Sequence, residues 1–281
     1  MIDLILPPVV AGLLILSIHA YLGLHVLARG VIFVDLAFAQ IAALGTTVAV
    51  LIGYHNPTVQ ILFALGFTLV GALIFSFTRM EDSIVPQEAI IGITYIVASA
   101  TVILLAGFTA EGAEHIQETM TGSLIWVGWP QIGKMAVPYL VIGAIHVVFR
   151  RNFLAVTLAP EKASSVRFWD FLFYVMFGIV IAFSVELAGV LMVFSTLVIP
   201  GVIAFLFTHR LTYALLLAWF AGTVAIVGGI GASFYWDVAT GPLLVCTFGL
   251  VLILAAIVKK LFGVRPTGPI IVPGLTDGAG E

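Results

Sequence analysis

A carboxylate lies inside an apolar stretch near the N-terminus: Asp35, in VIFVDLAFAQIAALG. Placing a carboxylate in hydrocarbon costs about 3 kcal/mol, so such residues usually face a bundle interior, a partner or a water-filled path. Asp35 is interpreted either as a station on a cation path or as a buried carboxylate satisfied by backbone or a neighbouring helix. Gln40 lies about 140° further around an ideal helix, so the two share a face only if the helix is distorted.

A second acid, Glu186, lies in the apolar sequence SVELAGVLMVFSTLVIPG. Gly189, Pro200 and Gly201 in this sequence each permit a helix to bend. Glu186 is therefore interpreted either as a residue that lines a gate or as an ordinary acid at a helix end near water.

A cluster of acids and one imidazole lies in the connection TAEGAEHIQETMTGSLIWVGW. In a helix, Glu111 would neighbour His115, and Glu114 would neighbour Glu118, because each pair is four residues apart. Carboxylate and imidazole together are ligands that zinc and manganese accept. The same composition is typical of a wet, acidic interfacial helix, so capture of an external ion and a plain surface helix both remain open.

The long polar connection RRNFLAVTLAPEKASSVRFWD contains a segment with the composition of a short helix begun at a proline. Short surface helices between membrane spans can dock a soluble partner. The segment is therefore interpreted either as a docking site or as a solvated linker, and its candidate contact residues are Pro160, Glu161, Lys162, Ser164 and Ser165.

The composition requires a membrane to bury these elements, because 62% of the 281 residues are hydrophobic and only 9% are charged. Apolar stretches of about 20 residues recur along the chain, which is the length of a helix that crosses a bilayer. We predict an all-α, polytopic membrane bundle of eight or nine helices. The expected spans lie near residues 4–26, 31–53, 58–78, 89–108, 132–149, 168–186, 189–208, 211–232 and 241–261.

The basic residues predict the orientation of these spans. Every Lys and Arg except Lys134 falls on alternate connections of the nine-span arrangement. The positive-inside rule then places those connections in the cytoplasm, with the N-terminus outside and the C-terminus inside a bacterial-type plasma membrane.

The chain divides into a transmembrane domain, residues 1–262, and a Pro- and Gly-rich tail, residues 263–281, that we expect to be disordered and cytoplasmic. It contains no GxxxxGK[ST] loop to cradle a nucleotide, so any ATPase must be a separate subunit. We expect transport rather than enzymatic activity, no permanently bound cofactor and no nucleic-acid partner.

Several segments match short motifs in a fixed order. ARGVIFVDLAFAQIAALG is similar to a Gly-Asp-Ala-Leu-Ser-His-Ala motif, with Asp35 at the aspartate, and QEAIIGITY is similar to a Glu-Asp-Ala-Ala-Ile-Gly segment, with Glu88 at the second acid. LAPEKASSVRF matches an Asp-Pro-Glu-Phe-Ala segment at Pro160 and Glu161. ELAGVLMVFSTLVIPGVIAFLFTHRL and SFYWDVATGP are similar to two longer signatures that follow. In this order they resemble the membrane permease of metal-type ATP-binding-cassette (ABC) importers.

The resemblance implies a permease homodimer in the lipid bilayer that imports zinc, manganese or iron. It also implies two cytoplasmic ATPase subunits at the coupling segment around Pro160 and an external metal-binding protein that delivers the ion. The family has a histidine four residues after the second-span aspartate, where it shares a helical face with that acid. This chain has Ala39 there, and Gln40 is a poorer, neutral oxygen donor.

On this basis the candidate translocation path contains Asp35, Gln40, Glu88 and Glu186. ATP hydrolysis on the partner would move the coupling segment and rock the spans, so that the path opens alternately to each side. Two facing carboxylates, one from each chain, would attract a dication without trapping it. The alternatives are a proton-coupled secondary transporter with Asp35, Glu88 or Glu186 as the relay, and an ABC permease for a non-metal ligand.

Overall fold

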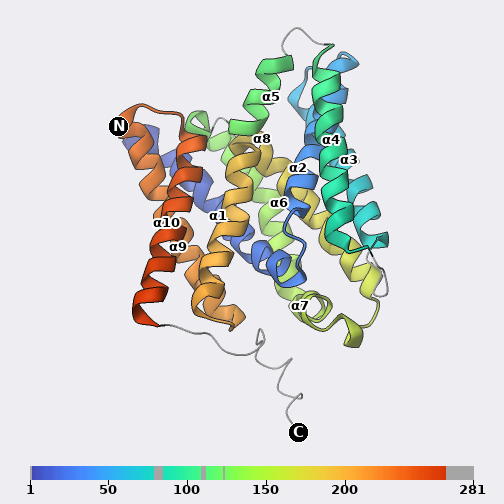
Figure 1. Cartoon of the computed structure of the whole chain (residues 1–281). Helices are drawn as coiled ribbons and strands as arrows, with labels where there is room; N and C mark the ends of the chain where they lie inside the picture. The colour runs from blue at the N-terminus through green and yellow to red at the C-terminus, as the bar shows by residue number, and fades with distance from the viewer. Residues whose placement is uncertain (1, 79–84, 109–111, 123, 264–281) are drawn as a thin grey trace.

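The computed structural model describes residues 2–78, 85–108, 112–122 and 124–263, and these residues fold as helices joined by short connections (Figure 1). The elements in chain order are α1 (Ile2–Arg29), α2 (Val34–Leu51), α3 (Pro57–Phe77), α4 (Gln87–Ala106), α5 (Gly112–Thr121), η1 (Leu124–Trp126), α6 (Trp129–Val148), α7 (Arg150–Leu158), η2 (Pro160–Lys162), α8 (Val166–Phe207), α9 (Leu211–Trp236) and α10 (Thr240–Phe262).

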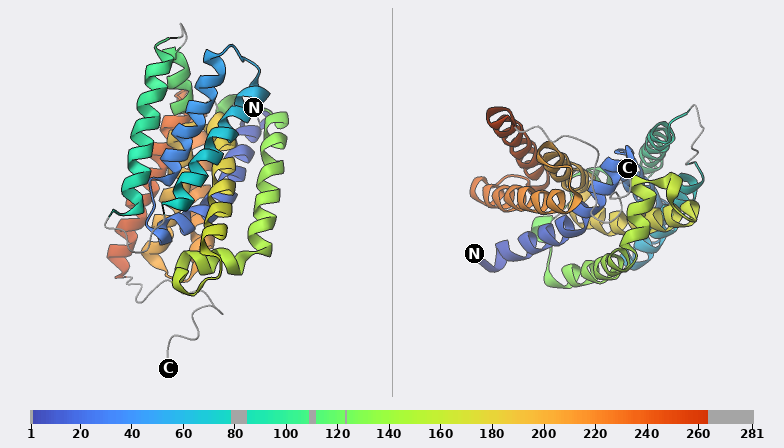
Figure 2. Two further views of the ribbon diagram at one scale, coloured as in Figure 1. Left: turned by 90° about the vertical axis from the view of Figure 1, so that its right-hand side faces the viewer. Right: turned by 90° about the horizontal axis from the view of Figure 1, so that it is seen from below.

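Eight of the described helices are long and apolar enough to cross a membrane, namely α1, α2, α3, α4, α6, α8, α9 and α10. They run side by side in a bundle (Figure 2). Their ends carry the expected signals: Asn56 caps the start of α3 by accepting a hydrogen bond from the Thr58 amide at 2.8 Å, and Gly263 ends α10 in the left-handed conformation. The prediction of an all-α polytopic bundle is confirmed.

The longest helix, α8, has 42 residues and is bent back on itself at Gly189 (φ 73°, ψ 159°). Its first arm, residues 166–188, runs antiparallel to α1. Asp170 near the start of this arm pairs with Arg29 at the end of α1, and Ser184 near its other end lies 3.3 Å from a ring nitrogen of His19, further back along α1.

The second arm of α8, residues 190–207, returns parallel to α1. Leu197 contacts the chain at Gly23, and a side chain at Gly201 would lie 2.6 Å from Leu27, one turn later in α1. Each arm is at least 18 residues long, which is enough to cross the hydrocarbon core. The eight long helices therefore make nine crossings, and the two expected spans 168–186 and 189–208 are the arms of one bent helix.

The bent helix lies at the centre of the bundle. It packs against α2 and α3 on one side and against α1, α9 and α10 on the other, and most residues of both arms are buried. Between α2, α3 and the first arm the packing is aromatic: the Phe38 ring centroid lies 5.2 Å from that of Phe75 and 5.7 Å from that of Phe177.

The two ends of the bundle differ in charge. At one end α1, α6 and α10 finish and α8 and α9 start, and we call this the basic end because it carries Arg29, Arg150, Arg151, Arg167, Arg210, Lys259 and Lys260. At the opposite end α2 finishes, α3 begins and α8 bends. The expected tail lies outside the described residues, apart from Gly263.

Candidate functional site: a cavity above a buried carboxylate

A cavity of about 200 Å³ lies between α2, α3, α5 and the bend of α8. It is at the end of the bundle opposite the basic end. Its walls are mostly small or apolar, with four polar side chains among them. The lining residues are Ala42, Ala43, Thr46, Pro57, Gln60, Ile61, Ala64, Thr119, Ala182, Val185 and Glu186.

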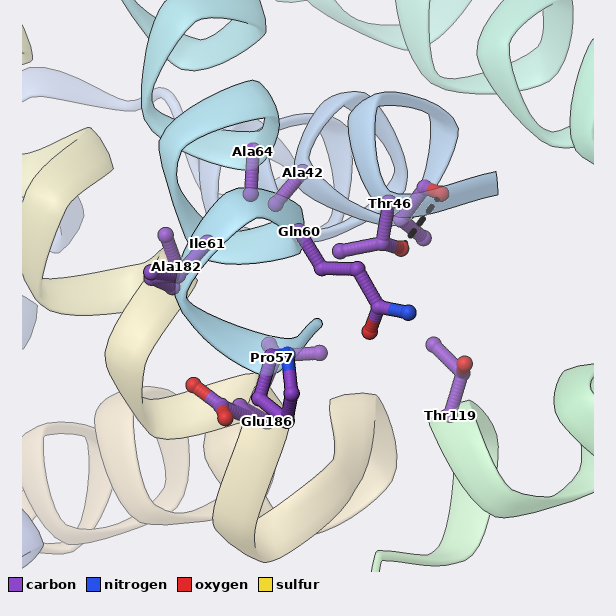
Figure 3. A pocket seen from close by; sticks show the side chains of 11 residues that line it. Ala42, Thr46, Pro57, Gln60, Ile61, Ala64, Thr119, Ala182 and Glu186 are labelled. Carbon is purple, nitrogen blue, oxygen red and sulfur yellow. Dashed lines mark hydrogen bonds between the residues drawn. The ribbon is translucent and has the colours of Figure 1, made fainter. Parts of the chain in front are cut away.

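The polar groups come from four different elements. Figure 3 shows the Gln60 amide extending between Glu186 on one side and Thr46 and Thr119 on the other. The Thr46 hydroxyl donates to the Ala43 carbonyl at 2.9 Å, so its oxygen keeps acceptor capacity toward the cavity. Oxygen atoms of carboxylate, amide and hydroxyl groups are the ligands that hard, hydrated cations accept.

The cavity closes toward the basic end on three buried alanines, Ala42 from α2, Ala64 from α3 and Ala182 from α8, which form one packed cluster. Beyond them Phe38 fills the space between the same helices. A side-chain carbon at Gly178 would lie 2.9 Å from the Phe38 ring, so the absence of a side chain there lets α8 approach. The cavity therefore has a mouth at one end and a tightly packed floor.

Asp35 lies below this floor, in the first turn of α2 at the basic end. It is 1% exposed, and neither carboxylate oxygen has a hydrogen-bond partner among the described residues. Seven and eleven residues separate it from Ala42 and Thr46, so all three lie within about 20° of one line along the helix. Asp35 is thus aligned with the cavity wall and lies about 16 Å from Thr46, toward the N-terminal end of α2.

Gln40 does not lie on this line, and Glu88 comes from a different helix. Gln40 is buried in α2, but the helix is regular there, so it projects away from the face that carries Asp35. Glu88, in the first turn of α4, accepts a hydrogen bond from the Phe33 amide at 3.0 Å. It therefore holds the residue that precedes α2, and its place on the path stays a prediction.

The coupling segment is shorter than the sequence pattern indicates. Only Pro160–Lys162 form a 3-10 turn, η2, and Ser164 and Ser165 follow it as exposed residues outside a helix. Ser165 has a positive φ of 55° and directly precedes α8. A full helix, α7, lies just before the turn, and the sequence reasoning did not foresee it. Its signal was the close spacing of Phe153, Leu154 and Val156, which are buried against the bundle.

The expected external ion-capture residues are only partly described. Glu111 lies outside the described residues, whereas Glu114, His115 and Glu118 belong to α5. Across the residues that the structure describes, no three His, Cys, Asp or Glu side chains form a group that could hold a metal ion together.

Comparison with known proteins supports a transport role. Residues 1–259 match the family model described as the ABC 3 transport family. The chain belongs to the ABC 3 transport family. It is 26% identical over 247 residues to the manganese transport system membrane protein MntC of Halalkalibacterium halodurans, covering 84% of this chain and 80% of that protein.

Two further similarities also extend over most of each chain. The high-affinity zinc uptake system membrane protein ZnuB of Haemophilus influenzae is 21% identical over 259 residues, covering 91% of this chain and 97% of ZnuB. The fold matches a chain of PsaBC from Streptococcus pneumoniae, solved in complex with a Fab, with a TM-score of 0.74, 20% identity and coverage of 91% and 94%. This ABC 3 chain is therefore a multi-pass membrane transport protein.

Proposed function

We propose that the chain is the permease subunit of an ABC importer of divalent metal ions, with zinc, manganese or iron as the cargo. The strongest support is the alignment of Thr46, Ala42 and Asp35 on one face of α2. It places a cavity with four polar side chains in line with a buried carboxylate that has no hydrogen-bond partner among the described residues. The relatives that carry manganese and zinc in their names agree with this cargo.

In this proposal the basic end faces the cytoplasm of a bacterial-type cell, since Lys and Arg favour that side. The N-terminus is then outside and the C-terminus inside, and the cavity receives an ion from an external binding protein. The turn η2 and the exposed Glu161 lie at the basic end, where a cytoplasmic ATPase subunit would dock.

We further propose that two copies form a homodimer, because one carboxylate below the cavity floor gives weak liganding on its own. Because Asp35 is buried in its own chain, the Asp35 of a second copy would add its charge to a passing dication only once the packing around α2 opens. The floor of alanines and Phe38 would separate as the two copies rock, which opens the path to the basic end.

The proposal predicts ATP-dependent metal accumulation. Cells that express this chain with its ATPase and binding-protein partners should accumulate one of manganese, zinc or iron above cells that lack the chain. A partner that binds ATP without hydrolysing it should abolish the gain. Accumulation that persists with this inactive ATPase would instead favour a proton-coupled carrier, and gain of a non-metal nutrient alone would favour the same architecture with another cargo.

Glu186 at the cavity mouth should set the apparent affinity for the ion. Glu186→Gln keeps the shape but removes the charge that concentrates a dication, so we expect the half-saturating metal concentration to rise about tenfold with little change in maximal rate. The reciprocal variant Gln60→Glu adds a carboxylate to the same cavity and should lower that concentration. Uptake titrations of both variants check this, and an unchanged titration for Glu186→Gln would remove it from the path.

A further inference from the structure

A buried ion pair ties three helices together at the basic end. Arg29, the last residue of α1, places its Nη1 2.9 Å from Oδ1 of Asp170 near the start of α8, and the two side chains are 3% and 1% exposed. The Nε of the same guanidinium donates to the hydroxyl oxygen of Thr157 in α7 at 3.1 Å. One side chain of α1 thus contacts both α7 and α8.

Thr157 is held from a second point on α1. Its hydroxyl proton goes to the Phe153 carbonyl at 2.8 Å, so its oxygen is left to accept from Arg29 and from Nδ1 of His25, which lies 2.8 Å away. His25 and Arg29 are one turn apart on α1. The end of α7 is therefore fixed to α1 through two neighbouring donors.

The surroundings of this ion pair are buried and largely aromatic. The Arg29 guanidinium carbon lies 4.0 Å above the Phe173 ring of α8. Phe153 of α7 stacks on His146 of α6 with centroids 4.3 Å apart. Hydrogen bonds and ion pairs in such low-dielectric surroundings are strong and directional, so the three helices are expected to move together rather than slide.

These contacts lie between the proposed ATPase contact and the walls of the cavity. Helix α7 ends two residues before η2, the proposed ATPase contact. The first arm of α8 starts beside Asp170 and ends at the bend that carries Glu186 and Gly189 next to the cavity. Arg29 ends α1, and Asp35 follows six residues later in the first turn of α2. A displacement of α7 would therefore be passed on to α8 and, through the end of α1, to α2, and both helices line the cavity.

We propose that Arg29, with Asp170 and Thr157, is the joint that transmits the ATP-driven displacement of the α7–η2 segment to α1 and α8. Arg29 is a positioning residue and does not contact the cargo. The inference rests on the proposed function in that it assumes an ATPase docked at η2. It goes beyond that function by assigning the transmission of movement to three named side chains.

The test measures movement of the path without any cargo. In a chain with its cysteine removed (Cys246→Ser), Thr46→Cys places a single thiol in the cavity wall. This chain is reconstituted with its ATPase subunit, and the rate of labelling by a membrane-impermeant maleimide is measured with and without ATP plus vanadate. Thr157→Val and Asp170→Asn, each conserving volume, are compared with Lys260→Gln, which removes an exposed charge at the same end.

We expect the nucleotide-dependent change in labelling rate to fall about tenfold in Thr157→Val and Asp170→Asn, while complex assembly and ATP hydrolysis persist and Lys260→Gln behaves as the parent. Arg29→Lys, which keeps the charge but loses the forked geometry, should show the same loss. A purely structural joint would instead lower assembly and hydrolysis together and leave the labelling response of the assembled complex intact, which would overturn the proposal.

The outcomes also separate this inference from the proposed function. A nucleotide response that is lost in the variants supports the joint even if the parent complex imports no metal, in which case only the cargo is wrong. A parent complex that shows no nucleotide response at all would overturn the joint, because there would be no ATP-driven movement for it to transmit.

Discussion

Gly189→Ala is expected to prevent the chain from reaching its folded state. Gly189 has φ 73° and ψ 159°, a conformation that residues with a side chain avoid at a cost of about 1–3 kcal/mol. The added carbon would also lie 2.6 Å from the carbonyl carbon of Thr121 and 2.8 Å from the carbonyl oxygen of Met120. These are backbone atoms that cannot rotate away, so the total cost should reach roughly 4 kcal/mol.

The measurement is the yield of monodisperse protein in detergent and its melting temperature. Gly249→Ala is the matched control, because Gly249 is in the middle of α10 with nothing within 4 Å of the added carbon. Alanine there should be neutral or stabilising by about 1 kcal/mol, since alanine has the higher helix propensity. Equal behaviour of the two variants would mean that the bend of α8 does not need its glycine.

The spans of the bundle could be predicted because their signal is local. Length and hydropathy alone mark each crossing, and Gly189 between two apolar stretches marked a bend. The local sequence does not predict that the backbone stays helical on both sides of Gly189. This depends on a contact with a distant segment, because Gly122, just after α5, meets the α8 backbone at the bend.

The structure of the coupling region could likewise be predicted only in part from the sequence. The polar connection 150–167 was evident from its charges, but α7 within it depends on burying Phe153 and Val156 against the bundle. The Arg29 and Asp170 pair joins residues 141 positions apart in sequence. Such a pair leaves no spacing signal, because its distance is set by the folding of three helices rather than by one of them.

The cavity could not be predicted either, since its floor is made of alanines from three helices. Ala42, Ala64 and Ala182 are ordinary small residues in their own segments and become a floor only where the segments meet. The sequence was more informative about the two acids. The apolar residues around Asp35 predicted its burial, and Glu186, which was singled out as a possible gate residue, lines the cavity. Their joint role in transport stays a prediction.

Asp35→Asn is expected to lower metal uptake about a hundredfold while leaving the fold intact or more stable. Both carboxylate oxygens are buried and lack a hydrogen-bond partner among the described residues, so the substitution breaks no bond that the structure shows. It also removes the cost of holding a carboxylate in apolar surroundings, which should raise the free energy of unfolding by about 1–3 kcal/mol. A residue kept at such a cost is expected to serve the cargo.

Uptake at saturating metal and the melting temperature of the purified complex together decide this point. Asp237→Asn makes the same chemical change at an exposed position at the end of α9 and should alter neither quantity. If Asp35→Asn transports at the parental rate, the ion does not pass this carboxylate. If it loses both transport and stability, Asp35 satisfies a group elsewhere in the assembly. Loss of transport with retained or increased stability is the combination that places a buried charge on the ion path.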